Sequence, residues 1–505
     1  MLPTQNSLSE GELKSNLRNI TIDGYTSQIM VVLSTGPFLI AFALLLGANN
    51  FFIGLIVAIP PLLQILQIFS IQLVEKRRNR RAITVSSLIF YRISIFSIAL
   101  IPFIFSIQFG LIFLIIFLIA QSIFASVGHT AWASWMHDTI PTNQLGIFYS
   151  RRMILSTIIS LMASLLAAIF IDFYVLNNLE NQLYGYSILF FIAFLFGMIS
   201  IFYISRISEP EMHKPEVNVK FLKIISEPFK DKNYRKLLIF LGIWSFALNL
   251  ATPFFTVYMF KKLNFSITLI IILTIINQMT IVLFLRIWGY LIDKFSNKSI
   301  LNICCPLLII CILAWTFTTL PDFYYFTIPL LIIIHIFMGI SMAGILLATQ
   351  NICLKLAPKG KGNPYLAVTS VVTSLALGTA PIIGGIFADY FEASELSWTL
   401  QLVSPNGSLT FKTLYLQGFD FYFLFAFFIG LISLLLLVKV RETGDVKRKV
   451  IIHELILGMK KSFRWLSSIG GVEKMVLSPK SIIYMPIKSK PEFKRKRFIK
   501  NKNIR

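Results

Sequence analysis

The chain has 505 residues, of which 56% are hydrophobic and 14% are charged, and its mean hydropathy is +0.76. A soluble chain of this length, with about two to four domains, would carry more charge, so the composition indicates a membrane protein. The formal net charge of +23 could indicate a nucleic-acid binder, but residues 441–505 alone hold 18 Lys and Arg against 5 Asp and Glu. Positive charge gathered in a tail and in alternate loops is typical of membrane orientation, and we expect no nucleic-acid partner.

Apolar runs of about 20 residues or more recur along the chain, each long enough to cross a hydrocarbon core of roughly 30 Å. Because a spanning segment must satisfy its own backbone hydrogen bonds, we predict that each run is an α-helix. The expected spans are twelve, at 24–47, 50–73, 83–105, 108–138, 151–176, 183–205, 236–260, 267–292, 299–319, 322–355, 362–390 and 419–440.

Basic loops alternate with loops that carry little charge. Loops after the even-numbered spans hold 20 Lys and Arg, whereas loops after the odd-numbered spans hold 3. Short basic loops stay in the cytoplasm, so both termini are predicted to be cytoplasmic.

The two halves of the chain resemble each other. The triplets around Asp172 and Asp389 (Ile-Asp-Phe and Ala-Asp-Tyr) lie 217 residues apart, and a polar loop divides six spans from six. Two copies inserted the same way round are related by an axis along the membrane normal. We therefore predict an N-terminal segment 1–23, a six-helix bundle 24–205, a central loop 206–235, a second six-helix bundle 236–440 and a basic tail 441–505.

Two loops at matching places share one pattern. Residues 289–301 read GYLIDKFSNKSIL, and residues 71–83 read IQLVEKRRNRRAI. In each, an apolar helix end meets an acid (Asp293 or Glu75), then a lysine, and then an Asn-Lys or Asn-Arg pair. One such match is a weak signal, whereas two in matching positions are a strong one.

These features resemble the major facilitator superfamily of secondary transporters over about residues 24–440. The signature loop of that family is Gly-x-x-x-Asp-Arg/Lys-x-Gly-Arg-Arg/Lys. The second copy here keeps Gly289, Asp293, Lys294 and Lys298, with Ser296 and Asn297 in place of Gly and Arg.

The first copy is further from the family pattern: Ile71 replaces the Gly and Glu75 the Asp, while Lys76 and Arg80 are kept. Residues 129–153 are also similar to a Trp-x-x-Trp-x-x-Asp-x-x-Pro segment of a bacterial subgroup with no assigned substrate.

The resemblance implies an all-α membrane protein whose twelve helices form two pseudo-symmetric six-helix bundles. It implies a secondary transporter in the bacterial cytoplasmic membrane that moves a small organic solute by alternating access. We expect no cofactor and no metal, because the four cysteines all lie in apolar segments and show no ligand spacing. We also expect a monomer.

The family also implies a cytoplasmic gate. Glu75 and Asp293 would face the N-terminal ends of spans 11 and 5, where the helix dipole stabilises a carboxylate by about 0.3–1 kcal/mol. Asp138 is expected to meet Lys76 or Arg80. The predicted gate residues are Glu75, Lys76, Arg80, Asp138, Arg151, Arg152, Gly289, Asp293, Lys294 and Lys298; Arg77, Arg78 and Arg81 could equally be loop charges that set topology.

Few polar side chains lie within the predicted spans. Spans 1, 4, 7 and 10 line the cavity in the family, and Arg286 of span 8 could serve the gate or an anionic cargo. The candidate cavity residues are Gln121, His129, Trp132, Asn249, Arg286 and His335. The alternative for each is a hydrogen bond to a neighbouring helix, worth about 0.6 kcal/mol.

Two further expectations concern charge inside the membrane. Arg92 of span 3 should extend its side chain towards the cytoplasm, since a central arginine is costly. No Asp or Glu falls in the middle of a predicted span, so proton coupling would use His129 and His335, whose side chains titrate near neutrality.

Motifs of the common enzymes are missing, so we do not expect catalysis. The rival interpretation is a non-transporting relative, an assembly factor or sensor that docks a partner through its basic tail. The start of that tail is amphipathic, with Ile451, Leu455, Met459 and Phe463 on one stripe, and we expect it to lie on anionic lipid.

Overall fold

The computed structural model describes residues 10–140, 145–212, 221–319, 325–358, 362–404, 407–444 and 450–451. The chain divides into two units at residue 448, and the fold below is that of the first. The amphipathic stripe predicted for the tail lies almost wholly outside the described residues.

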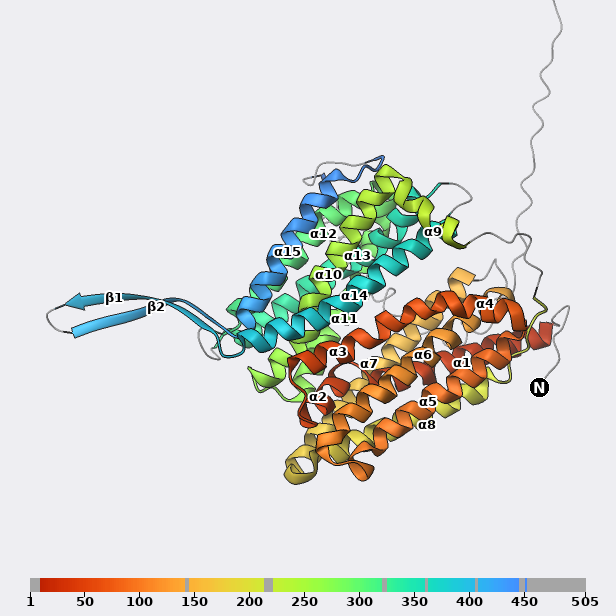
Figure 1. Cartoon of the computed structure of the whole chain (residues 1–505), viewed down its shortest axis with the longest axis horizontal. Helices are drawn as coiled ribbons and strands as arrows, with labels where there is room; N and C mark the ends of the chain where they lie inside the picture. The colour runs from red at the N-terminus through yellow and green to blue at the C-terminus, as the bar shows by residue number, and fades with distance from the viewer. Residues whose placement is uncertain are drawn as a thin grey trace, which may run out of the picture. The chain divides into compact units, whose positions relative to one another are not determined.

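The first half of the chain is helical throughout its described part (Figure 1). Its helices are α1 (Glu10–Ser34), α2 (Pro37–Leu45), α3 (Asn50–Leu63), α4 (Gln67–Arg77), α5 (Arg80–Ile104), α6 (Ile107–Thr139), α7 (Leu145–Asn177) and α8 (Gln182–Ile204).

The second half adds a pair of strands to its helices. These elements are α9 (Phe221–Lys230), α10 (Lys232–Lys261), α11 (Ile267–Lys294), α12 (Asn297–Ala314), α13 (Thr327–Leu356), α14 (Gly362–Phe391), β1 (Glu395–Ser404), β2 (Gly407–Gln417) and α15 (Phe419–Lys439).

Among the described residues, twelve helices are long and apolar enough to cross a membrane, which confirms the twelve predicted spans. The first, Gly11–Leu45, begins well before residue 24 and consists of α1 and α2. Gly36, at φ 61°, breaks it, and Pro37 restarts it at the first helical position. The second, Asn50–Arg77, joins α3 to α4 through a 3₁₀ turn that follows Pro60 and Pro61.

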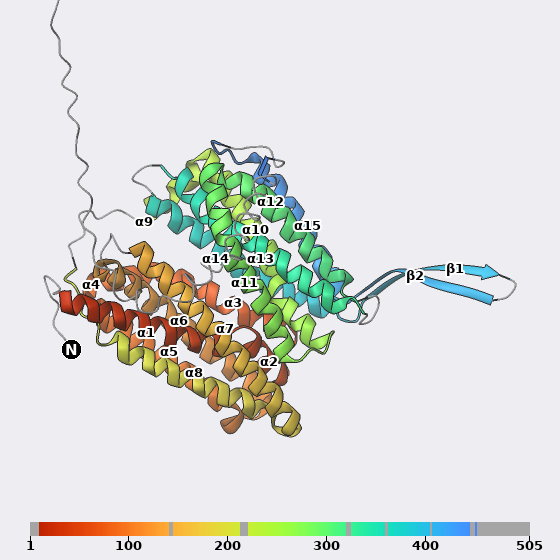
Figure 2. The same cartoon turned by 180° about the vertical axis from the view of Figure 1, so that it is seen from behind.

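The helices form two bundles with the same internal neighbours (Figures 1 and 2). In the first bundle α5 packs on α6 and α8, and α1 packs on α7 and α8. In the second, α12 packs on α13 and α15, and α10 packs on α14 and α15. Each pair of the first bundle has its counterpart in the second, as the sequence repeat predicts.

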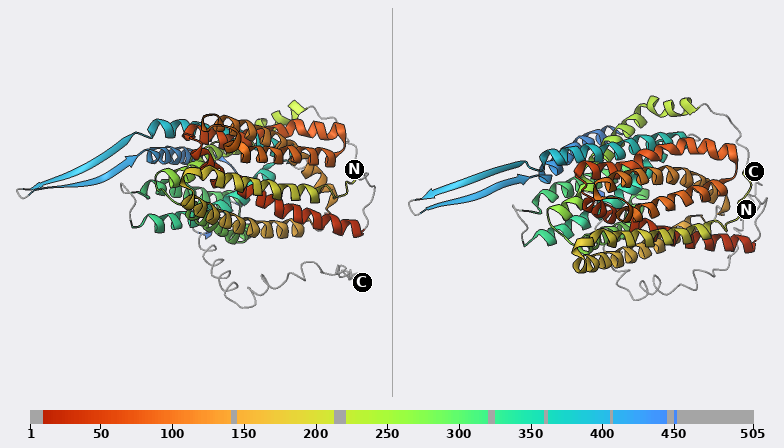
Figure 3. Two further views of the ribbon diagram at one scale, coloured as in Figure 1. Left: turned by 90° about the horizontal axis from the view of Figure 1, so that it is seen from below. Right: turned by 60° about the horizontal axis from the view of Figure 1, so that its bottom comes forward.

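We name the two ends of the bundles for what they carry. The hairpin end holds the β1–β2 hairpin and the loops after odd-numbered spans. The terminal end holds the start of α1, the end of α15 and the loops after even-numbered spans (Figure 3). The hairpin lies between the spans predicted at 362–390 and 419–440, where no strand was predicted.

At the terminal end, an acid from beyond the last helix of each bundle holds a helix start. Glu209 Oε1 and Oε2 accept the backbone N–H groups of Arg80 (2.7 Å) and Arg81 (3.2 Å), the first two residues of α5. Glu442 does the same for α12, accepting from Asn297 (3.3 Å) and Lys298 (2.7 Å). Both acids satisfy N–H groups that a helix cannot satisfy itself.

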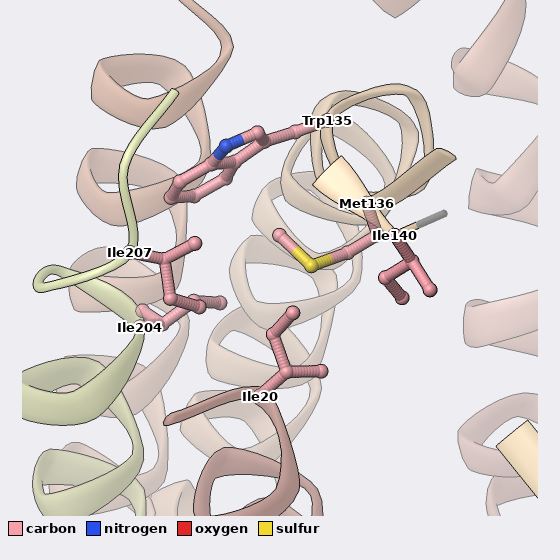
Figure 4. Close-up of a cluster of buried hydrophobic side chains, with 6 residues drawn as sticks. All are labelled: Ile20, Trp135, Met136, Ile140, Ile204 and Ile207. Carbon is pink, nitrogen blue, oxygen red and sulfur yellow. The ribbon is translucent and has the colours of Figure 1, made fainter. Parts of the chain in front are cut away.

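An apolar cluster positions Glu209 (Figure 4). Ile20 of α1, Trp135, Met136 and Ile140 at the end of α6, and Ile204 and Ile207 at the end of α8 are all buried and packed together. Trp135 Nε1 donates to the Ser208 carbonyl oxygen at 3.2 Å, which fixes the turn that carries Glu209.

We predict that Glu209→Gln destabilises the protein. The amide keeps one acceptor oxygen but leaves a helical N–H group and the buried Arg80 side chain short of a partner, at a cost of about 1–3 kcal/mol. The melting temperature of the detergent-purified protein should fall. The matched control is Glu211→Gln, which alters an exposed acid two residues away; equal melting temperatures for the two variants would contradict the role of Glu209.

Candidate functional site

Arg80 is the centre of the predicted gate loop in the first bundle. Its side chain is 1% exposed and forms an ion pair with Asp138 at 2.5 Å, so the expected partner of Asp138 is Arg80 rather than Lys76. Its other amino group donates to the Pro210 carbonyl oxygen at 2.8 Å. These contacts all lie within the first bundle.

The second bundle has a counterpart in which a lysine replaces Asp138 and an asparagine replaces Arg80. Lys355 stands 217 residues after Asp138 and forms an ion pair with Glu442 at 2.8 Å. Asn297 stands 217 residues after Arg80, and its side-chain amide donates to Glu442 at 2.8 Å. Neither Glu209 nor Glu442 is among the residues predicted from the sequence, although each is an acid within five residues of the last helix of its half.

The two acids of the signature loops lie at the surface of the described structure. Glu75 and Asp293 are exposed, and no ion pair of either acid occurs in the described part of the chain. Lys76 and Lys294 are exposed as well, and Arg151 is half-buried. A Cβ atom built on Gly289 would meet nothing within 4 Å among the described residues, so this face of α11 is open.

Arg152, a predicted gate residue at the start of the fifth span, contacts α1. Its Nε donates to the Ile20 carbonyl oxygen at 3.1 Å, and its Nη2 lies 3.5 Å from Asp23. In this state Arg152 therefore forms its ion pair within the first bundle.

At the hairpin end, two carboxylates cross from one bundle to the other. Asp389 of α14 accepts the N–H groups of Asn50 and Phe51, the first residues of α3, both at 2.9 Å. Asp172 of α7 accepts those of Ile267 (3.2 Å) and Thr268 (3.0 Å), the first residues of α11. The repeat thus gives two matching bridges: an acid of the second bundle binds a helix start of the first, and an acid of the first bundle binds a helix start of the second.

The α3–α14 contact is close enough to need glycine. A Cβ atom on Gly54 would collide with the Pro381 carbonyl oxygen, and one on Gly385 would collide with the Asn50 carbonyl oxygen. Glu392 extends the junction, since it accepts from the Asn50 side chain at 3.3 Å and pairs with Lys261 at 3.2 Å. The bundles are therefore locked together at the hairpin end.

Of the predicted cavity residues, the structure brings His129 and Trp132 together. Their rings lie 6.2 Å apart, and the Arg152 guanidinium lies 5.4 Å from the Trp132 ring. His129 is exposed. The matching position of the second half, 217 residues later, is Leu346 of α13, which is exposed as well. Gln121, deeper in α6, is buried, and its Oε1 has no hydrogen-bond partner among the described residues.

The other candidates are scattered. His335 is 7% exposed, bonded to the Leu331 carbonyl oxygen of its own helix at 2.8 Å and packed on Trp315, so it lies inside the second bundle. Asn249 donates to the Ser245 carbonyl oxygen of its own helix at 2.8 Å. Arg286 is exposed, two turns before Asp293 on the same face of α11.

Two expectations about charge inside the membrane are wrong. Arg92 is 2% exposed and donates to Ser200 Oγ at 3.2 Å, so it does not extend towards water. Ser200 in turn donates to Asp23 at 2.7 Å, which puts a buried acid inside the first span. The error arose because α1 begins at Glu10, which brings residue 23 into the bundle.

No group of three or more His, Cys, Asp or Glu that could hold a metal ion occurs in the part of the chain that the structure describes. The arrangement instead offers a junction closed at one end, exposed acids at the other and a polar cluster where α1, α6 and α7 meet.

Residues 24–347 match the sequence model described as Major Facilitator Superfamily. No curated protein matches the chain at the level of sequence. A mutant form of the nucleoside transporter NupG superposes with a TM-score of 0.64 at 12% identity, covering 85% of this chain and 100% of that one.

A D-xylose-proton symporter superposes with a TM-score of 0.59 at 14% identity, covering 86% of this chain and 98% of that one. The inward-open xylose transporter XylE from E. coli superposes with a TM-score of 0.55 at 14% identity, covering 88% and 98%. At these identities the likeness concerns the fold. Since the family match spans more than half of the chain, this protein belongs to the Major Facilitator Superfamily of membrane transporters.

Proposed function

We propose that this secondary transporter moves a small organic solute by alternating access, and that the state described here is closed at the hairpin end and open at the terminal end. The observation that carries the proposal is the contrast between the two ends. Asp172 and Asp389 bridge the bundles at one end, while Glu75 and Asp293 are exposed at the other.

The charge of the loops indicates which end of the bundles faces the cytoplasm. The basic loops lie at the terminal end, which we place in the cytoplasm of a bacterial cell together with both termini. The state is then inward-open. The similar XylE structure is of an inward-open conformation of that transporter, which supports the same assignment here.

Alternating access exchanges one pair of carboxylate bridges for the other. Each contact between a carboxylate and a helix N-terminus contributes about 0.3–1 kcal/mol, or up to about 2 kcal/mol when partly buried. Two conformations that interconvert differ by a few kcal/mol, so two such contacts are enough to set the balance. As the hairpin end opens, Glu75 and Asp293 would reach the starts of α14 and α7.

The cluster of His129, Trp132 and Arg152 is the proposed cargo contact of the first bundle. It combines an exposed imidazole, an aromatic face and a guanidinium at the junction of α1, α6 and α7. Gln121, deeper in α6, adds a buried side-chain oxygen that has no hydrogen-bond partner among the described residues.

We predict that Asp172→Asn and Asp389→Asn both favour opening of the hairpin end. Each removes a negative charge from a helix N-terminus and should shift the population by about 2- to 5-fold. Distances between spin labels on the hairpin ends of the two bundles would measure the shift. The control is Glu180→Gln, an exposed acid at the same end; label distances that move equally in the control would remove the bridges from the mechanism.

Asp293→Asn should act in the opposite direction. Because Asp293 forms no ion pair with the described residues, the substitution leaves this state unaffected and weakens the outward-open one. Membrane insertion should stay normal while the transport rate falls. Combined with Asp172→Asn, it should return the label distances towards those of the unaltered protein, and additive shifts in one direction would refute the exchange of bridges.

Thermal melting of the purified protein across a panel of metabolites tests the function itself. A solute at 100 times its dissociation constant stabilises the folded state by about 2.7 kcal/mol, which raises the melting temperature. Trp132→Ala should abolish the rise, and the solute should then cross proteoliposome membranes that hold the unaltered protein. A transporter keeps this response when residues 452–505 are deleted, whereas an assembly factor that docks through its tail loses its activity.

A further inference from the structure

Two arginines lie at the same depth on two neighbouring helices, one from each bundle. Helices α7 and α11 run in opposite directions and are joined at the hairpin end, where Asp172 accepts the N–H groups of Ile267 and Thr268. Arg152 comes 20 residues before Asp172 on α7, and Arg286 comes 19 residues after Ile267 on α11. At 1.5 Å per residue, both arginines lie about 30 Å from this bridge, towards the terminal end.

Arg286 lies on the side of α11 that faces away from its own bundle. Trp288 and Asn277 of α11 donate hydrogen bonds to carbonyl oxygens of α13 at 2.8 and 3.0 Å, which marks the inner side of the helix. With 3.6 residues per turn, Arg286 is about 160° or more from both, and Asp293 is on the same side. Arg286 is exposed there. An arginine within a span is costly unless it faces protein or water, so this side borders the water between the bundles in the proposed inward-open state.

The positive charge on the α7 side of this junction is only partly balanced. The Asp23 carboxylate accepts from Ser200 at 2.7 Å, and Ser200 in turn accepts from Arg92 at 3.2 Å. The contact of Asp23 with Arg152 is longer, at 3.5 Å. One carboxylate therefore serves two guanidinium groups, and Arg286 adds a further positive charge across the junction. Charges in a low-dielectric interior need a partner of opposite sign.

The repeat indicates that the fold itself does not need this pair of arginines. The residues 217 positions away from Arg286 and Arg152 are Phe69 and Thr369, which carry no charge. Thr369 is buried, and its hydroxyl is hydrogen-bonded to the Tyr234 hydroxyl at 2.7 Å within the second bundle. The arginines thus occur in only one of the two matching junctions, as expected for a binding site and not for the scaffold.

We propose that the solute is a small organic anion whose carboxylate or phosphate group binds between Arg152 and Arg286. This inference rests on the proposed transport function and gives the chemical class of its cargo. A guanidinium group presents paired donors that match two oxygens of such an anion. The Trp132 ring lies 5.4 Å from the Arg152 guanidinium and offers an aromatic face to the rest of the solute.

The same pair makes closure of the terminal end depend on the solute. As that end closes, α7 and α11 approach each other, and the two arginines repel as like charges. A bound anion replaces this repulsion with an attraction to each arginine, so the loaded protein closes more readily than the empty one. Exchange of one anion for another across the membrane is then faster than net flow.

The charge of the junction can be tested before the solute is known. Val282→Cys places a thiol one turn before Arg286 on the exposed side of α11, and the four native cysteines are buried. The measurement, in proteoliposomes at low salt, is the labelling rate with an anionic methanethiosulfonate divided by the rate with a cationic one. A unit charge about 10 Å away in water changes this ratio about fourfold. Arg286→Gln should lower the ratio by about that factor.

Two further variants serve as controls for the labelling ratio. Arg286→Lys keeps the charge and should keep the ratio. Arg235→Gln removes an exposed arginine at the start of α10 and should leave the ratio unchanged.

Matched pairs of solutes test the cargo. Glucose 6-phosphate and glucose, uridine monophosphate and uridine, and succinate and succinamide differ mainly in charge. We expect anions, and not their neutral partners, to raise the melting temperature of the purified protein. Both Arg286→Gln and Arg286→Lys should raise the concentration needed for half of the rise at least tenfold, whereas Arg235→Gln should not change it. Proteoliposomes preloaded with the anion should take it up faster than empty ones.

Two outcomes would overturn the anion site. One is a labelling ratio that Arg286→Gln leaves unchanged, or a thiol at Val282→Cys that reagents in water do not reach. The other is a rise in melting temperature with neutral solutes that persists in Arg286→Gln, which would leave the proposed transport function standing. Anions that bind through Arg286 but never cross the membrane would support the site and contradict the proposed transport instead.

Discussion

One interaction recurs at four helix starts, and the rest of the structure depends on it. In α3, α5, α11 and α12 the residue before the helix is Asn or Ser, and its side chain accepts the N–H group of the third helical residue. The capping side chain does not reach the first two N–H groups of the helix. In each case the two oxygens of a distant carboxylate accept these two groups. The carboxylate also meets the positive end of the helix dipole.

The four carboxylates divide by what they join. Glu209 and Glu442 hold helix starts within their own bundle, at the terminal end, and both are nearly inaccessible to solvent. Asp172 and Asp389 hold helix starts of the opposite bundle, at the hairpin end. The same chemistry therefore makes each bundle rigid and makes the junction between bundles reversible, because only the second pair must break for the bundles to separate.

The buried charges of the first bundle serve its rigidity. Asp23, Arg92 and Arg152 connect α1, α5 and α7, with Ser200 of α8 between Asp23 and Arg92. Glycines admit the arginines, since a Cβ atom on Gly24 would collide with Arg152 and one on Gly197 would collide with Arg92. Charges in a low-dielectric interior are costly unless they are paired, so this cluster holds four helices in one arrangement.

The sequence by itself determined the twelve spans, their repeat and the contact between Asp138 and one of two nearby cations. Hydropathy and loop charge are properties of single segments, so they decide membrane insertion one segment at a time. Asp138 and its two candidate partners all lie near helix ends, which leaves few possible contacts between them. Only the tertiary structure decided that Glu209 and Glu442 hold α5 and α12, and that Asp23 and Arg92 are buried together. Those contacts join residues more than 60 positions apart along the chain. The pattern of hydrophobic residues along each helix does not indicate which helix ends are in contact. The hairpin and its bulge between Trp398 and Thr399 were also decided only by the tertiary structure, because the pairing register of a strand depends on its partner strand as well as on its own sequence pattern.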